Sequence, residues 1–337
     1  MKKIFTDNII ELNRDMEPFI IQSGAVRPPA FIKKYGDKYK PLQFVHFSDI
    51  HAVLELWNRI VEFINYYDDY ISFGIHTGDY CGNNRQQYVD FYNYGDRCVK
   101  PIYNCVGNHD TYNSRSERDL VEKRLTYERL FAPMNDISAD VSFMEGDFSM
   151  TYYKDFDESN IRIIVLDLYY DIAKQQKWLA SILDDAREKG LSVITAMHAP
   201  TDHIVESYGV TFHTANDYVG LYGEHSTTPF ENIIAEFVEN GGEHICNIAG
   251  HHHHDLFGIT SSGILNTCVP CATDWNGWCD GRRVRGTRTY DCFNVITIDV
   301  NLGLLKICRI GDNCDIFLRE KKALCFDYRN RKVISDC

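Results

Sequence analysis

The chain is predicted to fold as an α/β protein in which strands and amphipathic helices alternate and a second sheet packs on the first. Short apolar runs of strand length end in polar, often glycine-containing loops, and segments with apolar residues at spacings of three and four lie between them. After His254 the pattern changes to closely spaced alternating strands, which indicates the second sheet.

Five apolar runs predict buried strands that end at a common site. Each is followed by a short block that contains Asp, Asn or His. Because open α/β sheets bind ligands outside the carboxyl ends of their strands, the five blocks are expected to converge on one crevice. The predicted strands are Leu42 to Phe47, Ile71 to Ile75, Ile102 to Val106, Leu191 to Met197 and His244 to Ala249.

Three segments predict helices that cover the sheet faces. In the first of them, Trp57, Ile60 and Ile64 recur at helical spacing. The third precedes the last of the five strands and indicates a βα-type crossover. The helices are expected over Ala52 to Tyr67, Gln175 to Lys189 and Glu231 to Glu239, and the later strands over Leu256 to Ile259, Gly263 to Val269, Cys292 to Val300 and Leu304 to Ile310.

The polar blocks contain the residue types that hold a pair of metal ions. Imidazole suits zinc, iron and other borderline metals, whereas carboxylate and amide oxygens suit harder ones, so the mixed set predicts a transition-metal pair. Two ions about 3.5–4 Å apart need a shared ligand, for which Asp79 is the natural carboxylate. The blocks are Asp49-Ile50-His51, Gly78-Asp79, Gly107-Asn108-His109-Asp110, His198 and Gly250-His251-His252-His253.

Taken singly, each block has an ordinary explanation. Gly107-Asn108 could form a turn, and His198 alone would more often be a buried structural histidine. The run from His251 to His254 is internal and follows a predicted strand, unlike a terminal tag. The conjunction of all five blocks in order favours a phosphoesterase, in which a metal-bound hydroxide attacks phosphorus in line.

The order and approximate spacing of these blocks, from Asp49 to His253, resemble those of the calcineurin-like metallophosphoesterase superfamily, the dinuclear purple acid phosphatase-like enzymes. The resemblance implies a four-layer α/β/β/α sandwich of two mixed β-sheets flanked by helices. It also implies two divalent or trivalent ions of manganese, iron or zinc. The first metal would be held by Asp49, His51, Asp79 and His253, and the second by Asp79, Asn108, His198 and His251.

The same resemblance implies catalytic roles for two residues of the third block. His109 matches the histidine that protonates the leaving group or stabilises its charge, and Asp110 would orient an imidazole. The second block continues as Tyr80-Cys81-Gly82-Asn83 and lacks the Asp-Arg pair of the phosphoprotein phosphatase branch. A Ser/Thr protein phosphatase is therefore not expected.

Composition limits the partners and the compartment. The 337 residues, 44% hydrophobic and 25% charged, predict a globular domain over residues 41–311 with extensions at 1–40 and 312–337. A net charge of −13 opposes nucleic-acid binding and fits a small phosphorylated substrate. The start is polar and no apolar run approaches the ~18 residues that span a bilayer, so a cytoplasmic protein without membrane contact is expected.

The twelve cysteines are expected to be reduced. Cys268 and Cys271 form one Cys-x-x-Cys, but no second pair has the spacing of a structural metal site, so buried thiols are favoured.

Two segments are candidates for substrate recognition. The residues from Thr201 to Pro229 form either a lid or a packed surface loop. Trp275, Arg282 and Arg285 could stack on a base and pair with phosphate, or belong to a solvated basic turn. The expected substrate is a small phosphodiester or a nucleotide-like phosphomonoester. The alternatives are a non-catalytic scaffold of the same fold and a nuclease that uses the same site.

Overall fold

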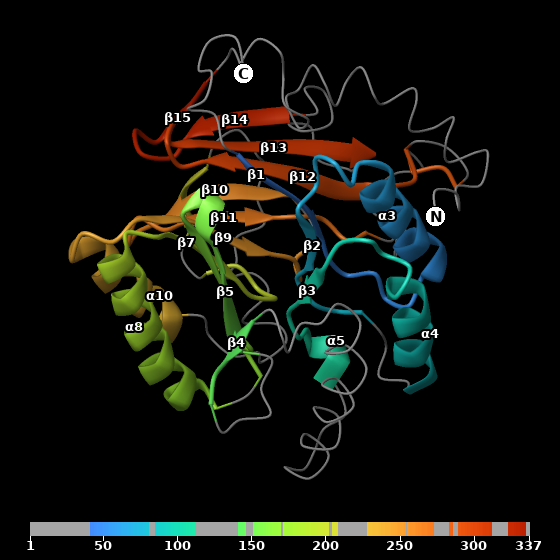
Figure 1. Cartoon of the computed structure of the whole chain (residues 1–337), viewed down its shortest axis with the longest axis horizontal. Helices are drawn as coiled ribbons and strands as arrows, with labels where there is room; N and C mark the ends of the chain where they lie inside the picture. The colour runs from blue at the N-terminus through green and yellow to red at the C-terminus, as the bar shows by residue number, and fades with distance from the viewer. Residues whose placement is uncertain are drawn as a thin grey trace.

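Two packed β-sheets with helices on both outer sides form the body of the protein in a computed structural model (Figure 1). The structure describes residues 41–80, 85–111, 141–145, 151–169, 171–201, 204–207, 228–253, 255–272, 283–285, 289–311 and 323–334. The four-layer α/β/β/α arrangement predicted from the sequence is thereby confirmed.

The first sheet is mixed and contains seven strands within the described residues, in the order β15-β14-β13-β12-β1-β2-β3. The β1, β2 and β3 strands run parallel, so their carboxyl ends share one edge, while β12 to β15 pair antiparallel. The strands are β1 (Leu42–Phe47), β2 (Phe73–His76), β3 (Ile102–Asn104), β12 (Cys292–Asp299), β13 (Leu304–Gly311), β14 (Ala323–Asp327) and β15 (Lys332–Val333).

The second sheet is also mixed, with eight strands in the order β4-β5-β6-β7-β9-β11-β10-β8 among the residues placed. Its central strands β6, β7, β9 and β11 are parallel. The strands are β4 (Ser142–Phe143), β5 (Tyr152–Phe156), β6 (Ile161–Val165), β7 (Ser192–Ala196), β8 (Ile204–Ser207), β9 (His244–Ala249), β10 (Leu256–Thr260) and β11 (Leu265–Cys268), and the 3-10 helix η3 (Asp157–Ser159) joins β5 to β6.

The helices pack their apolar faces onto the sheets. The α3 (Leu54–Tyr66) and α4 (Arg85–Gly95) helices lie on one side, and α8 (Ile172–Lys189) and α10 (Thr228–Glu239) on the other, while α5 (Asn108–Thr111) is a single turn after β3 (Figure 1). The α8 helix begins where the Asp171 carboxylate accepts the Lys174 N–H and ends at Gly190 with φ of 68°.

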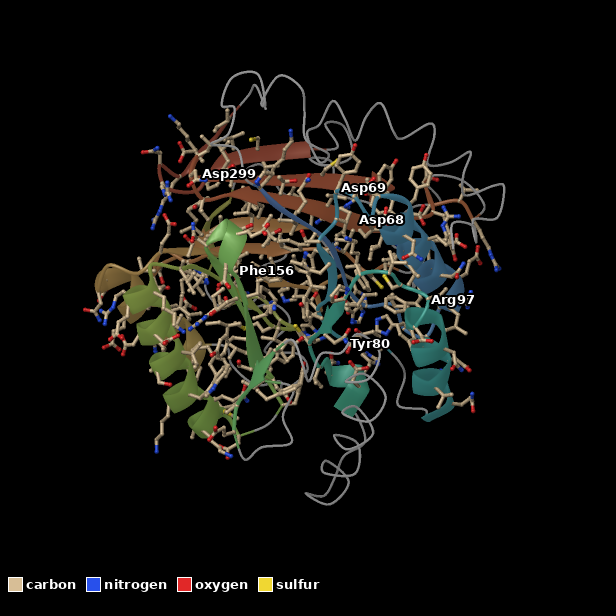
Figure 2. All side chains as sticks on the ribbon, in the orientation of Figure 1. Asp68, Asp69, Tyr80, Arg97, Phe156 and Asp299 are labelled. Atoms are coloured by element: carbon tan, nitrogen blue, oxygen red, sulfur yellow. The ribbon has the colours of Figure 1, made fainter. Side chains whose placement is uncertain are left out.

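Successive side chains of a strand point to opposite faces of its sheet, so one strand contributes to two separate apolar layers. In β6, Ile163 joins the core that also contains Phe47 and Ile75 of the first sheet, whereas Ile164 packs with Leu179 and Ile234 of the outer helices. Side chains fill the space between the sheets (Figure 2). Each such apolar side chain contributes roughly 1.5–3 kcal/mol on burial.

The strands after His254 correct one expectation. They do not form a second sheet by themselves: β10 and β11 join β9, whereas β12 and β13 extend the first sheet beside β1. Alternation in a sequence indicates which face of a strand is buried, but it does not indicate the neighbouring strand. The β14–β15 hairpin continues the first sheet within the predicted C-terminal extension.

The described cysteines differ in their oxidation state. Cys325 in β14 is disulfide-bonded, so the prediction of reduced cysteines is wrong at this position. Cys268 and Cys271 are buried and not disulfide-bonded. Among the placed helices, none is both long and apolar enough to cross a membrane.

Candidate metal centre

The ends of β1, β2, β3, β7 and β9 bring all five polar blocks together, as predicted. Within the first sheet, the Asp49 N–H donates to Gly78 O at 3.0 Å and the His51 N–H donates to Asp79 O at 3.1 Å. The Asp49 carboxylate then reaches the second sheet, where its Oδ2 accepts the His251 N–H at 3.0 Å. The two sheets are therefore joined through one of the candidate ligands.

Glycine allows these loops to approach so closely. A Cβ on Gly107 would collide with the Asp79 main-chain nitrogen and carboxylate, and a Cβ on Gly250 would collide with Ser48 and lie 2.6 Å from Asp49 Oδ2. Both positions lack room for any side chain. The glycines of the sequence blocks thus let the main chain lie directly against the candidate ligands.

Left-handed backbone is concentrated at the same place. Five candidate ligands have positive φ, a conformation that Asp and His adopt more readily than most residues but still uncommonly. Such clusters mark sites where the surrounding structure holds the chain in a strained shape. The φ values are 55° for Asp49, 48° for His51, 60° for Asp79, 65° for His251 and 58° for His253.

One half of the site is formed by Asp49, His51 and His253. The Nε2 atoms of His51 and His253 lie 3.3 Å apart, and Nε2 of His253 lies 3.2 Å from Asp49 Oδ1. The Asp49 side chain is fully buried. Three potential donor atoms therefore face a common point.

The other half contains Asp79, Asn108, His198 and His251. Nε2 of His198 lies 2.9 Å from Asn108 Oδ1, 3.2 Å from His251 Nδ1 and 3.5 Å from Asp79 Oδ2. Its other ring nitrogen, Nδ1, donates to Thr77 O at 2.6 Å if it carries the proton. That contact fixes the tautomer that leaves Nε2 available to a metal.

The electrostatics of the site favour positive charge at its centre. Burial raises the pKa of Asp49, but His253, His198 and His51 hold it well below its usual range. Burial lowers the pKa of His198, but the Asp79 and Asp49 carboxylates and Thr77 O together raise it to about 10. Burial also raises the pKa of Asp79, but His198 and His51 hold it below its usual value. Carboxylate charge buried in this way is costly without a cation.

The spacing of the imidazoles fits a pair of metal ions. Ligands about 2.0–2.1 Å from one metal lie roughly 2.8–3.4 Å apart at angles near 90–109°, and the His51–His253 and His198–His251 nitrogens lie 3.3 and 3.2 Å apart. Within the part of the chain that the structure describes, three groups have donor atoms that all lie within 4.8 Å of one another, and Asp79 belongs to two of them. The groups are Asp49, Asp79 and His198; His51, Asp79 and His109; and His51, His253 and Cys271.

His109 and Asp110 have different surroundings. The His109 imidazole is 29% exposed, and its Nε2 lies 3.9 Å from Asp79 Oδ2. Asp110 is fully buried, and its carboxylate accepts the N–H groups of Asp79, Tyr80 and Gly107 at 2.9–3.0 Å. These contacts hold the main chain at Asp79, Tyr80 and Gly107 in place, and the role of Asp110 in orienting an imidazole stays a prediction.

Three further histidines of the described residues lie in strands and form hydrogen bonds there. His46, His76 and His244 are structural: each has a hydrogen bond to Thr77, Gly78 or Thr195 and lies in a strand. His252 is buried. His203, His213, His225 and His254 lie outside the described residues, as does most of the segment proposed as a lid.

The predicted substrate residues are only partly described. Trp275 and Arg282 lie outside the described residues. The side chain of Arg285 is 76% exposed and forms an ion pair with Glu55 at the start of α3. Arg283, from the same arginine-rich segment, is buried and donates to main-chain carbonyls of Cys271, Ala272 and Tyr290, which is a structural role.

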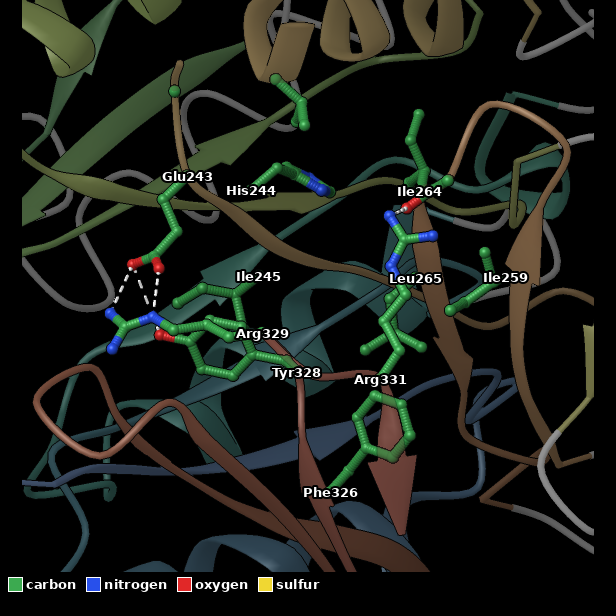
Figure 3. A pocket seen from close by; sticks show the side chains of 13 residues that line it. Glu243, His244, Ile245, Ile259, Ile264, Leu265, Phe326, Tyr328, Arg329 and Arg331 are labelled. Carbon is green, nitrogen blue, oxygen red and sulfur yellow. Dashed lines mark hydrogen bonds and ion pairs between the residues drawn. The ribbon is translucent and has the colours of Figure 1, made fainter.

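A cavity of about 170 Å³ lies away from this centre (Figure 3). It is lined by residues that include His244, Gly263, Phe326 and Arg331, and Glu243 and Arg329 form an ion pair in it. His244 begins β9, whereas His251 and His253 follow the carboxyl end of that strand. The cavity therefore lies at the end of the sheet opposite the candidate ligands.

The comparisons with known proteins agree with this geometry. Residues 42–255 match the sequence model of the calcineurin-like phosphoesterase family. No curated protein sequence matches the chain. Its fold is similar to that of a dimetal phosphatase from Danio rerio, with 14% identity, a TM-score of 0.56 and coverage of 82% of this chain and 98% of that one.

Two further solved structures are more distant. A Haemophilus influenzae NAD nucleotidase shares 13% identity at a TM-score of 0.44, covering 88% of this chain and 53% of the nucleotidase. A Mycobacterium tuberculosis phosphopantetheinyl hydrolase shares 10% identity at a TM-score of 0.40, covering 70% of this chain and 92% of the hydrolase.

Proposed function

This chain belongs to the calcineurin-like phosphoesterase family, and from that premise we propose that it hydrolyses a small, nucleotide-like phosphodiester or phosphomonoester at a two-metal site. Membership of this family makes it a hydrolase of phosphoric ester bonds that uses two metal ions.

The observation that carries the proposal is the convergence of buried carboxylates and imidazoles from five strand ends. We assign Asp49, His51, Asp79 and His253 to the first metal and Asp79, Asn108, His198 and His251 to the second. The shared position of Asp79 is supported by its membership of two of the three donor groups. The mixture of nitrogen and oxygen donors fits manganese, iron or zinc.

Two bound ions would supply charge stabilisation for the phosphoryl oxygens and an activated water for in-line attack. The chain itself supplies the remaining functions. Asp110 fixes the main chain at Asp79 and Gly107, and Thr77 O orients the His198 ring. Both contacts hold donor atoms in place before any metal binds, which reduces the cost of ordering them.

His109 is proposed as the group that protonates the leaving oxygen. Its ring lies at the site edge, 4.9 Å from the His51 ring and partly exposed, so it can contact substrate. Its main-chain N–H donates to Asp79 Oδ1 at 2.8 Å, which ties its position to the proposed bridging ligand. A proton donor at this place contributes about 10²–10⁴ to the rate of such reactions.

The preference for a nucleotide-like substrate is supported by Trp275, Arg282 and Arg285. An indole can stack on a base, and a guanidinium can pair with a phosphate oxygen pair. The net charge of −13 opposes a long polyanion. Glu55 forms an ion pair with Arg285 and lies in the first turn of α3. Because Glu55 is only four residues after His51, this ion pair holds Arg285 on the side of the fold that carries the candidate metal ligands.

The proposal is tested with three esters that share one leaving group: p-nitrophenyl phosphate, bis-p-nitrophenyl phosphate and the p-nitrophenyl ester of thymidine monophosphate. Metal-stripped protein is reloaded with manganese, zinc or iron, and Asp79→Asn serves as the inactive control. Stacking worth about 1–3 kcal/mol predicts that the nucleotide ester exceeds the bis-ester in kcat/KM by about 5- to 150-fold.

Equal turnover of the two diesters would contradict the nucleotide preference while leaving the phosphoesterase intact. Absence of metal-dependent turnover on all three esters, with two ions bound, would contradict the substrate class and favour the scaffold alternative.

A further inference from the structure

The thiol of Cys271 lies within the metal centre although it belongs to none of the five blocks. Its Sγ, one nitrogen of His51 and one nitrogen of His253 lie within 4.8 Å of one another. Donors bound at about 2.0–2.3 Å to one ion lie within about 4.6 Å of one another, so a group confined to 4.8 Å, with the two imidazole nitrogens 3.3 Å apart, is compatible with a common ion. Cys271 is buried and not disulfide-bonded.

We propose that Cys271 is a further ligand of the first metal, next to His51 and His253, and that its sulfur biases this position toward zinc or iron over manganese. The inference rests on the metal assignment of the proposed function. On binding, the thiol releases its proton to solvent and a sulfur–metal bond forms, with no change of oxidation state.

The backbone around Cys271 is held from two directions. On one side, the Ala272 N–H donates to Ser48 O at 2.9 Å, next to Asp49. On the other, the buried Arg283 guanidinium donates to Cys271 O at 2.9 Å and also to Ala272 O. Because the main chain is fixed on both sides, little conformational entropy remains to be lost when the sulfur binds.

The present contact of the thiol indicates where it points. Its Sγ lies 2.9 Å from Asp49 O, to which the S–H donates. Asp49 is itself assigned to the first metal, so the sulfur lies beside the ligand backbone on that side of the site. Since thiolate is a soft ligand and manganese prefers oxygen, sulfur in this set favours zinc or iron.

Cys268 provides a matched control. It lies three residues earlier, in β11, and is equally buried, but it packs with Ala249 and Leu256 and belongs to none of the donor groups found among the described residues. A Cys→Ser change at each position removes one sulfur from the same segment. At Cys271 the serine hydroxyl retains the capacity to donate to Asp49 O.

The test uses the full chain, stripped of metal and loaded with cobalt(II) or zinc. Wild type and Cys268→Ser are expected to show a sulfur-to-cobalt charge-transfer band in the near ultraviolet, and Cys271→Ser to lose it. Zinc X-ray absorption of the wild type should contain a sulfur neighbour at about 2.3 Å besides nitrogen and oxygen at about 2.0–2.2 Å. Zinc affinity should fall about tenfold or more in Cys271→Ser, and manganese affinity much less.

Wild-type protein that binds two ions without a sulfur neighbour would overturn the assignment of Cys271, even if every variant were lost to misfolding. An unchanged cobalt band in Cys271→Ser would overturn it as well. Either result could coexist with full phosphoesterase activity, whereas failure of the wild type to bind metal would overturn the ligand assignment beneath both proposals.

Discussion

The carboxylate of Asp110 accepts the main-chain N–H of Asp79 at 2.9 Å, so the residue after the proposed proton donor holds the backbone of the proposed bridging ligand. The same carboxylate accepts the N–H groups of Gly107 and Tyr80. Three hydrogen bonds to one buried charge fix two loops of the site relative to each other. Asp110 thereby links the second and third sequence blocks.

Asp110→Asn should weaken both the fold and the metal site. The amide keeps one acceptor oxygen and presents an N–H₂ group to N–H donors, so at least one buried donor loses its partner. The expected loss in the free energy of unfolding is about 1.5–3 kcal/mol, measured by denaturant unfolding. Metal affinity should fall about 10–100-fold. Unchanged stability and metal affinity would show that the carboxylate does not hold the loops.

His109→Ala should separate proton donation from metal binding. We expect two ions per chain to remain, with turnover of alkyl phosphate esters reduced about 10²–10⁴-fold and turnover of p-nitrophenyl esters reduced less, because p-nitrophenolate leaves without a proton. Steady-state kinetics with both ester types measure the difference. Since His109 also lies in a donor group with His51 and Asp79, loss of an ion in this variant would instead identify it as a ligand.

Gly107→Ala should displace Asp79. The added Cβ would lie 2.9 Å from Asp79 Cγ and closer still to its nitrogen. Overpacking of this kind costs about 1–3 kcal/mol, and metal affinity should fall with it. Gly190→Ala is the control, because its Cβ meets nothing within 4 Å and its φ of 68° costs only the strain of a left-handed alanine, about 1 kcal/mol. Equal metal affinity in the two variants would contradict the close-packing account.

Lys306→Met should stabilise the protein in a pH-dependent manner. Burial lowers the pKa of Lys306 from 10.5 to about 8, and no described residue provides a hydrogen-bond partner for its Nζ. At pH 7 the folded wild type carries this buried charge, so the variant should gain roughly 1–3 kcal/mol in the free energy of unfolding.

The sign of the pH dependence follows from proton binding. Between pH 8 and 10.5 the unfolded chain binds more protons at Lys306 than the folded chain does, so wild-type stability rises with pH over this window. The advantage of Lys306→Met should therefore be full below pH 8 and disappear by about pH 10.5. An advantage that stays constant across the window would exclude burial of the lysine charge as its source.

The positions of the metal-ligand candidates could be predicted because strand ends are local features. Each of Asp49, Asp79, Asn108, His198 and His251 follows an apolar run within a few residues, and the parallel pairing of the strands brings those ends to one edge. Two strands, Leu42–Phe47 and His244–Ala249, have the predicted bounds. Short-range sequence patterns were sufficient for this part.

The rest depends on contacts between distant residues. Cys271 meets His51 across 220 positions of the chain and follows the strand end of β11, where no Asp, Asn or His marks the site. Arg283 is indistinguishable in sequence from its exposed neighbour Arg285, and only packing separates the buried arginine from the exposed one. The sheet to which β12 belongs is likewise decided by its pairing with β1.

The number of metal ions per chain tests the central claim most directly. Purified wild type and Asp79→Asn, each reloaded with excess zinc or manganese and freed of unbound metal, are compared by elemental analysis against protein concentration. A two-metal site bridged by Asp79 predicts two ions in the wild type and at most one in the variant, with the fold retained by circular dichroism. One ion or none in the wild type, or two ions in Asp79→Asn, would contradict the account.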